Sequence, residues 1–251
     1  MGMQRYFDLK NLSENFPVVT FIIAMACLAI FLFTHNDINP YENLFGFTPA
    51  SPRIYSIVTY SFLHANMSHL IGNIIMLILV GIVLENYLDS VSYVLIYLTS
   101  GVVAAVFDML TRGVLGISGS LPFIGASGAI FGLAGVAMLV RPYEKMPSIL
   151  VILFVIPLIM LVMDVPRIME NPFIILLTLM FAGLLAALIL FQVPSLPTLA
   201  VFFFYALFTV MFIFIKGFTE NVSYLGHLGG LFGGLLSFFI FCRKSEKEKQ
   251  S

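Results

Sequence analysis

Serine and histidine often work together as a nucleophile and its base, and this chain sets one of each among glycines in apolar sequence. Ser127 lies within Gly125-Ala126-Ser127-Gly128, at the head of an apolar run that continues to Val140. His227 lies within Gly226-His227-Leu228-Gly229-Gly230. A serine hydroxyl is a weak nucleophile until a base within hydrogen-bond reach accepts its proton, and histidine is the usual base near neutral pH. The pair predicts attack on a carbonyl group, provided that the fold brings the two segments together.

A second cluster supplies hydrogen-bond donors for such a reaction. His64, His69 and Asn73 open another apolar run. His69 and Asn73 are four residues apart, so on a helix they share one face. The oxygen of an attacked carbonyl becomes negative and needs donors, which these side chains and the first N–H groups of the helix at Ser127 can provide. The sequence places no Asp or Glu beside His227, so the pattern favours a Ser–His dyad over a triad.

The composition defines the class of protein. The chain has 251 residues, of which 60% are hydrophobic and 10% charged, and its mean hydropathy is +1.05. Ordinary soluble domains are about 25% charged, so this is a protein with several membrane spans. The net charge of −1 gives no basic surface for nucleic acid. Cys27 and Cys242 lie far apart in apolar runs, and no His-Glu-x-x-His motif occurs, so we expect neither a metal nor another cofactor.

Hydropathy predicts eight membrane helices and hence an all-α polytopic bundle. The runs cover approximately residues 16–34, 68–88, 91–110, 122–140, 147–163, 172–193, 196–215 and 222–241. They form one transmembrane domain, 16–242, between a polar segment, 1–15, and a charged tail, 243–251, which we expect to be disordered. Pro157 inside the fifth run leaves open a re-entrant piece, in which case six spans are the alternative.

The distribution of positive charge predicts the orientation. With the N-terminus in the cytoplasm, eight Lys and Arg residues are cytoplasmic and four are outside, which favours both termini inside. The second, fourth and eighth spans then all run inward from the outer face. Their first turns carry the histidines, the asparagine and the serine, so these polar groups meet at one membrane depth. This requires an odd number of crossings between Ser127 and His227.

Glycines explain how these spans approach one another. Small residues at intervals of four let membrane helices pack closely, and this reading alone accounts for the glycines without any chemistry. The last span has two such stripes, and the fourth span has a matching one: Gly226, Gly230 and Gly234; Gly229 and Gly233; and Gly125, Gly128 and Gly132. Packing and chemistry are compatible here, because close packing is what brings His227 to Ser127.

Taken together, the motifs resemble the signatures of rhomboid intramembrane serine proteases. The resemblance covers roughly residues 50–140 and 220–241 and rests on Gly125-Ala126-Ser127-Gly128, His64-x4-His69-x3-Asn73 and Gly226-His227-x2-Gly230-x3-Gly234. It implies a core of six helices, here with two extra spans. It also implies that Ser127 is the nucleophile, that His227 is the general base, and that His69, Asn73 and the Ser127 N–H form an oxyanion hole.

The resemblance assigns further roles and shows departures. It implies that His64 holds the outer loop and that Glu85 is a polar contact between helices. Phe131 stands where many members have a tyrosine that stacks on the catalytic histidine. Tyr55-Ser56 replaces a common Trp-Arg pair, so we expect tyrosines to seat the loop 54–63 at the membrane interface. Three spans, where one is usual, separate the serine and histidine helices.

Three functions are compatible with parts of this pattern. The first is a protease of the cell membrane that cuts transmembrane protein substrates near their outer ends, within the lipid bilayer. The second is an inactive rhomboid-like protein that binds membrane clients, although such proteins usually lose the serine or the histidine. The third is a proton-relaying transporter, which would need a chain of acidic residues through the bilayer and leaves Gly-x-Ser-Gly unexplained. The sequence favours the protease.

Overall fold

The computed structural model describes residues 16–147, 195–203, 206–207 and 223–248, which fall into two units. The first unit, residues 1–14 and 141–217, contains the antiparallel strands β1 (Lys145–Pro147) and β2 (Ser195–Pro197). The second unit, residues 15–140 and 218–251, is helical. Its elements are α2 (Val18–Thr34), α3 (Asn39–Phe45), α4 (Ser56–Thr59), the 3₁₀-helix η1 (Tyr60–Phe62), α5 (Met67–Leu84), α6 (Ser90–Leu115), α7 (Ser127–Val140) and α13 (Tyr224–Glu248).

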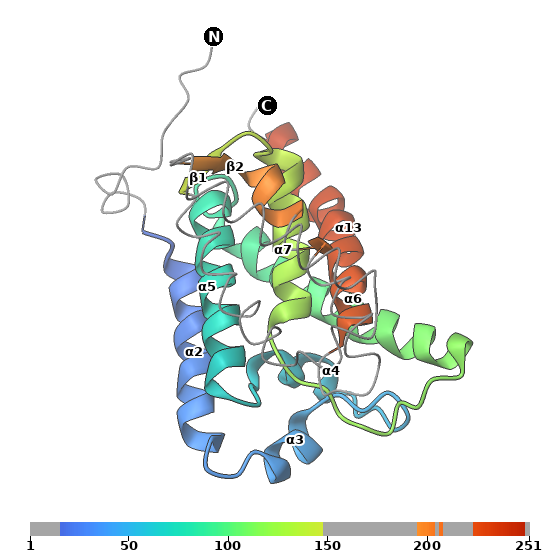
Figure 1. Ribbon diagram of the computed structural model, residues 1–251. Coiled ribbons are helices and arrows are strands. Elements are labelled where there is room, and N and C mark those ends of the chain that lie inside the picture. The colour runs from blue at the N-terminus through green and yellow to red at the C-terminus, as the bar shows by residue number, and fades with distance from the viewer. Residues whose placement is uncertain (1–15, 148–194, 204–205, 208–222, 249–251) are drawn as a thin grey trace, which may run out of the picture. The chain divides into compact units, whose positions relative to one another are not determined.

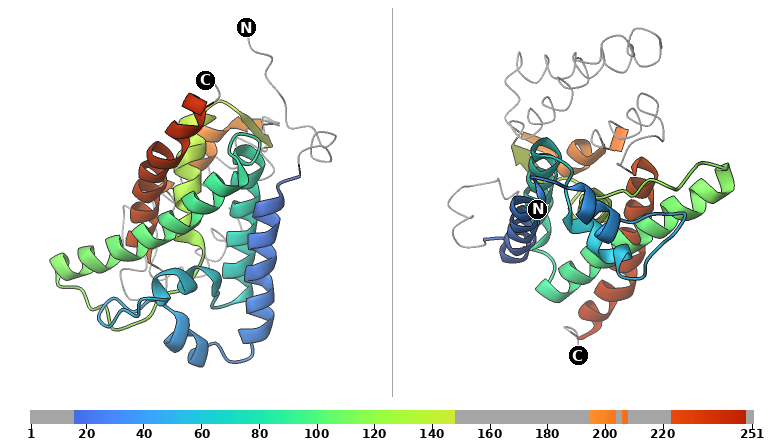
Figure 2. Two further views of the ribbon diagram at one scale, coloured as in Figure 1. Left: turned by 180° about the vertical axis from the view of Figure 1, so that it is seen from behind. Right: turned by 90° about the horizontal axis from the view of Figure 1, so that it is seen from below.

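The long helices of the second unit form a bundle in which α5, α7 and α13 run in the same direction. Helices α2 and α6 run the opposite way, and α6 crosses the bundle obliquely (Figures 1 and 2). Helix α13 packs against both α6 and α7, and α5 packs against α2 and α7. The parallel course of α5, α7 and α13 brings the beginnings of these three helices to the same end of the bundle.

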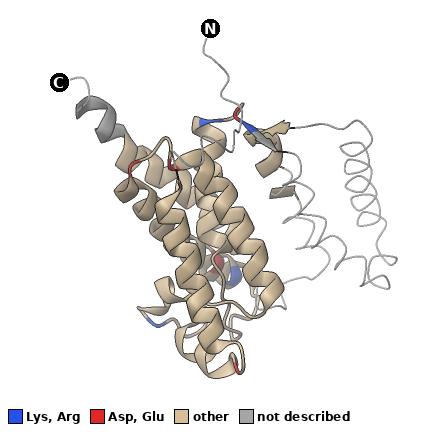
Figure 3. Ribbon diagram, turned by 90° about the vertical axis from the view of Figure 1, so that its left-hand side faces the viewer, with Lys and Arg blue, Asp and Glu red and all other residues tan. Residues whose placement is uncertain are grey.

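The helices have the composition of membrane spans. Among the described residues, α5, α6 and residues Tyr224–Cys242 of α13 are long and apolar enough to cross a membrane, while α2 and α7 are shorter apolar helices. Large apolar side chains face outward along them. In the second unit, acidic and basic residues are few; some lie toward the two ends of the bundle, and one acidic and one basic residue lie side by side between them (Figure 3). The chain is therefore a mostly helical membrane protein. Most of the fifth, sixth and seventh predicted runs lies outside the described residues, so the choice between eight and six spans stays open.

The structure changes several predicted boundaries. Helix α6 continues to Leu115, five residues beyond the predicted end, because the residue that stops it is the left-handed Gly116 (φ 66°). Residues 195–197 form a strand where the seventh helix was predicted to begin. Helix α13 extends to Glu248, so the prediction of a disordered tail from residue 243 was wrong for its first six residues.

Glu85 links the ends of three helices. It follows α5, and its carboxylate oxygens accept hydrogen bonds from the backbone N–H groups of Val19 (3.0 Å) and Thr20 (2.6 Å), in the first turn of α2. An acidic group is favourable there, because the N–H groups of a first helical turn have no partner within the helix. The Thr20 hydroxyl is in turn 2.8 Å from the hydroxyl of Tyr93 on α6.

The loop that precedes α5 is held by aromatic rings inside the protein. Tyr60 is only 2% exposed, packs against Phe47 and Phe123, and donates a hydrogen bond to the carbonyl of Gly101. The expectation that tyrosines seat this loop at the membrane interface was therefore wrong for Tyr60, because α6 offers its hydroxyl a buried acceptor. Tyr55, which is 42% exposed, remains at the surface.

Candidate active site

Ser127 is the first residue of α7, which begins five residues later than the run predicted at 122–140. The first backbone hydrogen bond of the helix runs from the N–H of Ile130 to the carbonyl of Ala126. The N–H of Ser127 therefore belongs to the first turn, whose donors have no acceptor within the helix. Gly125 has a φ of 128°, a conformation that favours glycine and turns the chain sharply just before the serine.

His227 reaches Ser127 from the first turns of α13. Its Nε2 lies 2.7 Å from the Oγ of Ser127. The ring of Phe131, one turn along α7, stacks on the imidazole with centroids 4.4 Å apart and planes inclined by 11°. His227 is only 5% exposed, and its Nδ1 has no hydrogen-bond partner among the described residues. The hydrogen bond and the stacked ring together fix the orientation of the imidazole toward the serine.

The glycine stripes bring α13 into backbone contact with α7 and with α6. A Cβ added at Gly230 would lie 2.8 Å from the carbonyl carbon of Gly128, and one added at Gly132 would lie 2.8 Å from the carbonyl oxygen of Gly230. The same stripe continues through Gly234, whose added Cβ would meet the backbone of Gly132. Gly226 was predicted to belong to this stripe, but its Cβ would meet Ser223 and lie 3.4 Å from the carbonyl oxygen of Ala104 on α6. The second stripe faces α6, where a Cβ on Gly229 would be 3.1 Å from the Cα of Ala104. Both faces of α13 thus depend on the absence of side chains.

Gly125 does not belong to the α7 contact stripe that the sequence suggested. A Cβ at this position would lie 2.7 Å from Nε2 of His69 and 3.6 Å from Nδ2 of Asn73. These two side chains come from the first and second turns of α5, four residues apart on one face. Gly125 therefore gives the imidazole and the amide room to approach the backbone that leads into Ser127.

His64 contacts the same group. Its Nε2 is 2.9 Å from Nδ2 of Asn73, and its ring centroid is 5.1 Å from that of His69. Burial, together with the positive charge of His69, lowers the pKa of His64 to about 3. A neutral imidazole has an unprotonated nitrogen that accepts, so Asn73 donates one amide hydrogen to His64. The second amide hydrogen of Asn73 is then oriented by this bond.

The arrangement has the parts that acyl transfer requires. A hydroxyl at a helix N-terminus is hydrogen-bonded to a buried imidazole, and an amide and a second imidazole lie against Gly125, two residues before the serine. In the described part of the chain, no group of three or more His, Cys, Asp or Glu side chains is placed to hold a metal ion.

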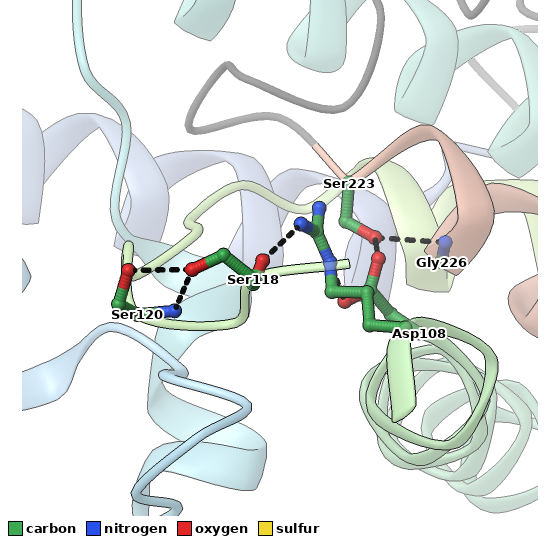
Figure 4. Close-up of polar contacts among 6 residues, drawn as sticks. Asp108, Ser118, Ser120, Ser223 and Gly226 are labelled. Atoms are coloured by element: carbon green, nitrogen blue, oxygen red, sulfur yellow. Dashed lines mark hydrogen bonds and ion pairs between the residues drawn. The ribbon is translucent and has the colours of Figure 1, made fainter. Parts of the chain in front are cut away.

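Sequence reasoning missed one cluster that adjoins the site. Asp108 and Arg112, one turn apart on α6, form an ion pair with Nε 2.7 Å from Oδ2. The hydroxyl of Ser223, directly before α13, donates a hydrogen bond to the other oxygen of Asp108 (Figure 4). The only signal was a serine placed just ahead of an apolar run, which is a common N-cap pattern.

Comparisons with known proteins agree with the motifs. Residues 51–174 match the family model of the Rhomboid domain. "Putative rhomboid protease YdcA" of Bacillus subtilis is 28% identical over 134 residues, covering 51% of this chain and 65% of that protein. Two proteins of Arabidopsis thaliana also match. "Rhomboid-like protein 11, chloroplastic" is 36% identical over 90 residues, which cover 36% of this chain and 30% of that protein. "Inactive RHOMBOID-like protein 8" is 34% identical over 104 residues, which cover 41% of this chain and 29% of that protein.

The chain therefore carries a Rhomboid domain over residues 51–174. It spans less than two thirds of the length of each of these relatives. The matched range includes Ser127 but ends before His227, and one of the relatives is named as inactive.

Proposed function

We propose that this protein is an intramembrane serine endopeptidase that cuts transmembrane segments of other proteins. The observation that carries the proposal is the 2.7 Å contact between Ser127 Oγ and His227 Nε2. A hydroxyl hydrogen-bonded to a buried histidine, on two helices that pack backbone to backbone, has few structural uses other than activation of the hydroxyl.

In the first step the Ser127 oxygen attacks the carbonyl carbon of the substrate peptide bond. The hydroxyl proton moves to His227 Nε2, which accepts it as general base. The stacked ring of Phe131 holds the imidazole in line with the oxygen. Because Nδ1 of His227 has no acceptor among the described side chains, the pair acts as a dyad.

The carbonyl oxygen becomes an oxyanion and accepts hydrogen bonds from His69, from Asn73 and from the Ser127 N–H. The Asn73 amide donates one hydrogen to His64, which leaves the other for the oxyanion. A preorganised donor of this kind is typically worth about 2.7–4 kcal/mol in the transition state.

Collapse of the tetrahedral intermediate breaks the C–N bond, and His227 gives its proton to the departing amine. Water, activated by the same histidine, then hydrolyses the acyl-serine ester and restores Ser127. A carbonyl in a continuous helix is hydrogen-bonded and shielded, so the substrate must unwind near the cut. Segments with glycine, proline or small residues there are the expected substrates.

The protease domain extends beyond the matched range to include α13 and covers residues 16–242, with the site toward the outer face of a cell membrane. Both termini are then cytoplasmic. Single cysteines at Arg167, Ser195 and Thr219, in a background lacking Cys27 and Cys242, test this orientation. Eight spans predict labelling from outside, inside and outside, respectively, and labelling of Thr219 only from the cytoplasm contradicts the arrangement.

A fluorophosphonate probe tests the activity directly, because it reacts only with an activated serine. The full-length protein in lipid vesicles should be labelled and should cleave a transmembrane substrate. Ser127→Ala and His227→Ala should lose both properties while they remain inserted and folded, and a chelator should have no effect. Undiminished turnover by either variant refutes the dyad.

A second candidate is supported by the relative that is named as inactive: a rhomboid-like protein that binds membrane clients without cutting them. The two functions are separated by the same probe. A folded wild-type protein that binds a transmembrane segment but is not labelled by the fluorophosphonate favours the second.

A further inference from the structure

A buried charge in the C-terminal half of α6 lies next to the first turn of α13, although no step of the proposed reaction uses it. The side chain of Asp108 is fully buried, and its ion pair with Arg112 on the same helix is almost as well shielded. Charges are costly inside a membrane protein and are commonly functional where they occur. The partners of Asp108 indicate what this one does.

Each oxygen of Asp108 has a different partner. Oδ2 accepts from Nε of Arg112 at 2.7 Å, and Oδ1 accepts from the hydroxyl of Ser223. A carboxylate can only accept, so the proton of the Ser223 hydroxyl must point toward Asp108. The lone pairs of this hydroxyl therefore face away from Asp108 and toward α13.

One of these lone pairs accepts the N–H of Gly226 at 2.8 Å. Ser223 is thus the N-cap of α13 and satisfies the N–H of the third helical residue, while its carbonyl accepts from the N–H of His227 at 3.3 Å. His227 is the next residue after Gly226. The cap consequently fixes the turn of helix that carries the base.

The same cluster also reaches the segment that leads to the nucleophile. Nη1 of Arg112 donates to the carbonyl of Ser118 at 3.0 Å, in the loop between α6 and α7 (Figure 4). Asp108 and Arg112 thereby join the chain ahead of Ser127 to the chain ahead of His227. Because these two residues of α6 contact both segments, they set the separation between the segment before Ser127 and the segment before His227.

We propose that Asp108 is a positioning residue for His227, acting through the Ser223 cap on the first turn of α13. This inference rests on the proposed function, because it concerns the placement of the base relative to Ser127. Loss of the Asp108 or the Ser223 side chain should slow attack by Ser127 without removing any group that touches the substrate.

Substitutions can remove the hydrogen bond from Ser223 to Asp108 while keeping side chains of similar size at these positions. In Asp108→Asn the amide oxygen still accepts the hydrogen bond from Arg112, so the amide NH₂ group faces Ser223. An NH₂ group cannot accept a hydrogen bond from the Ser223 hydroxyl. Ser223→Ala removes the cap, and Ser223→Thr restores a hydroxyl in the same place. Ser237→Ala is the matched control: this serine also joins α13 to α6, through a 2.6 Å contact with the Thr99 hydroxyl, but it lies ten residues beyond His227.

The test uses the full-length protein in lipid vesicles and measures the rate of fluorophosphonate labelling, kcat and KM for a transmembrane substrate, and the midpoint of chemical unfolding. Because a misplacement of about 1 Å costs up to roughly a hundredfold, Ser223→Ala and Asp108→Asn should label at least about tenfold more slowly, with the loss in kcat and not in KM. Ser223→Thr should recover most of the rate. The double variant should be no slower than the slower single one, because both changes break one chain of contacts. Ser237→Ala should lower the unfolding midpoint but leave labelling within about twofold of wild type.

Wild-type labelling in Ser223→Ala overturns the inference and leaves the protease function standing, as does an equal loss in Ser237→Ala. Should Asp108→Asn fail to fold, Ser223→Ala and its Thr rescue decide the question. A wild-type protein that is not labelled overturns the proposed function and this inference with it.

Discussion

Replacing Gly230 with alanine should separate the base from the nucleophile. The new Cβ would overlap the carbonyl oxygen of Gly128 and lie 2.8 Å from its carbonyl carbon, whereas ordinary contacts of a Cβ begin at 3.4 Å. The atoms that this Cβ would meet belong to the backbone of Gly128, and a backbone cannot rotate away as a side chain does. Clearing the carbonyl carbon alone moves helices α13 and α7 apart by about 0.6 Å at this point, and clearing the oxygen requires more.

The displacement acts on a contact with little tolerance. Ser127 Oγ and His227 Nε2 are 2.7 Å apart, and a shift of this size takes them past the limit of about 3.2 Å beyond which a hydrogen bond is weak. A misplacement approaching 1 Å costs up to about a hundredfold in rate, equivalent to about 2.7 kcal/mol. Overpacking also lowers stability by about 1–3 kcal/mol.

The assay measures fluorophosphonate labelling of Gly230→Ala relative to the amount of folded protein. Gly113→Ala is the matched control, because Gly113 is also within a helix but has open space where its Cβ would go. We expect about a hundredfold slower labelling for Gly230→Ala and an unchanged rate for Gly113→Ala. If folded Gly230→Ala reacts as fast as wild type, the backbone contact between α7 and α13 does not set the distance between serine and histidine.

Three other predictions concern the surroundings of Ser127. Asn73→Ala and His69→Ala should each lower kcat about a hundredfold, near the lower end for an oxyanion donor because others remain, and either variant being as inactive as Ser127→Ala would require another role. Phe131→Leu should slow labelling by up to about tenfold, since a stacked ring is worth about 0.5–1.5 kcal/mol; a tyrosine at this position should restore the wild-type rate. Because the pKa of His64 is lowered from 6.5 to about 3, the unfolded chain binds the proton first, so stability should fall as the pH drops from 6.5 toward 3, by up to about 1.4 kcal/mol per unit. Unfolding midpoints of His64→Gln should depend less on pH over this range, and equal slopes for the two proteins would contradict the burial argument.

The sequence was most informative where spacing alone determines which residues meet. His69 and Asn73 lie together because four residues make one helical turn, and the contact between α7 and α13 follows from glycines at the same interval. The first span was predicted at residues 16–34 and is a helix over Val18–Thr34. Hydrophobic runs, once bounded by polar residues, gave the helical class of the protein.

The sequence was least informative where a contact joins distant segments. The burial of Tyr60 depends on a carbonyl of α6 that is 41 residues away, and the contact between Ser223 and Asp108 joins residues 115 apart. Neither pairing leaves a local pattern. Gly125 was grouped with the contact glycines because its spacing fitted, although its backbone conformation and the approach of His69 give it a different use.

The ion pair on α6 has a consequence for the order in which the protein assembles. Asp108 and Arg112 are one helical turn apart, so their pair can form as soon as α6 exists, before any later helix has been synthesised. Two charges thus enter the membrane together as a neutral unit, which lowers the cost of inserting either. More than a hundred residues later, Ser223 is made and finds its acceptor already in place. Helix α13 therefore packs against a hydrogen-bond acceptor that α6 already provides when α13 is synthesised.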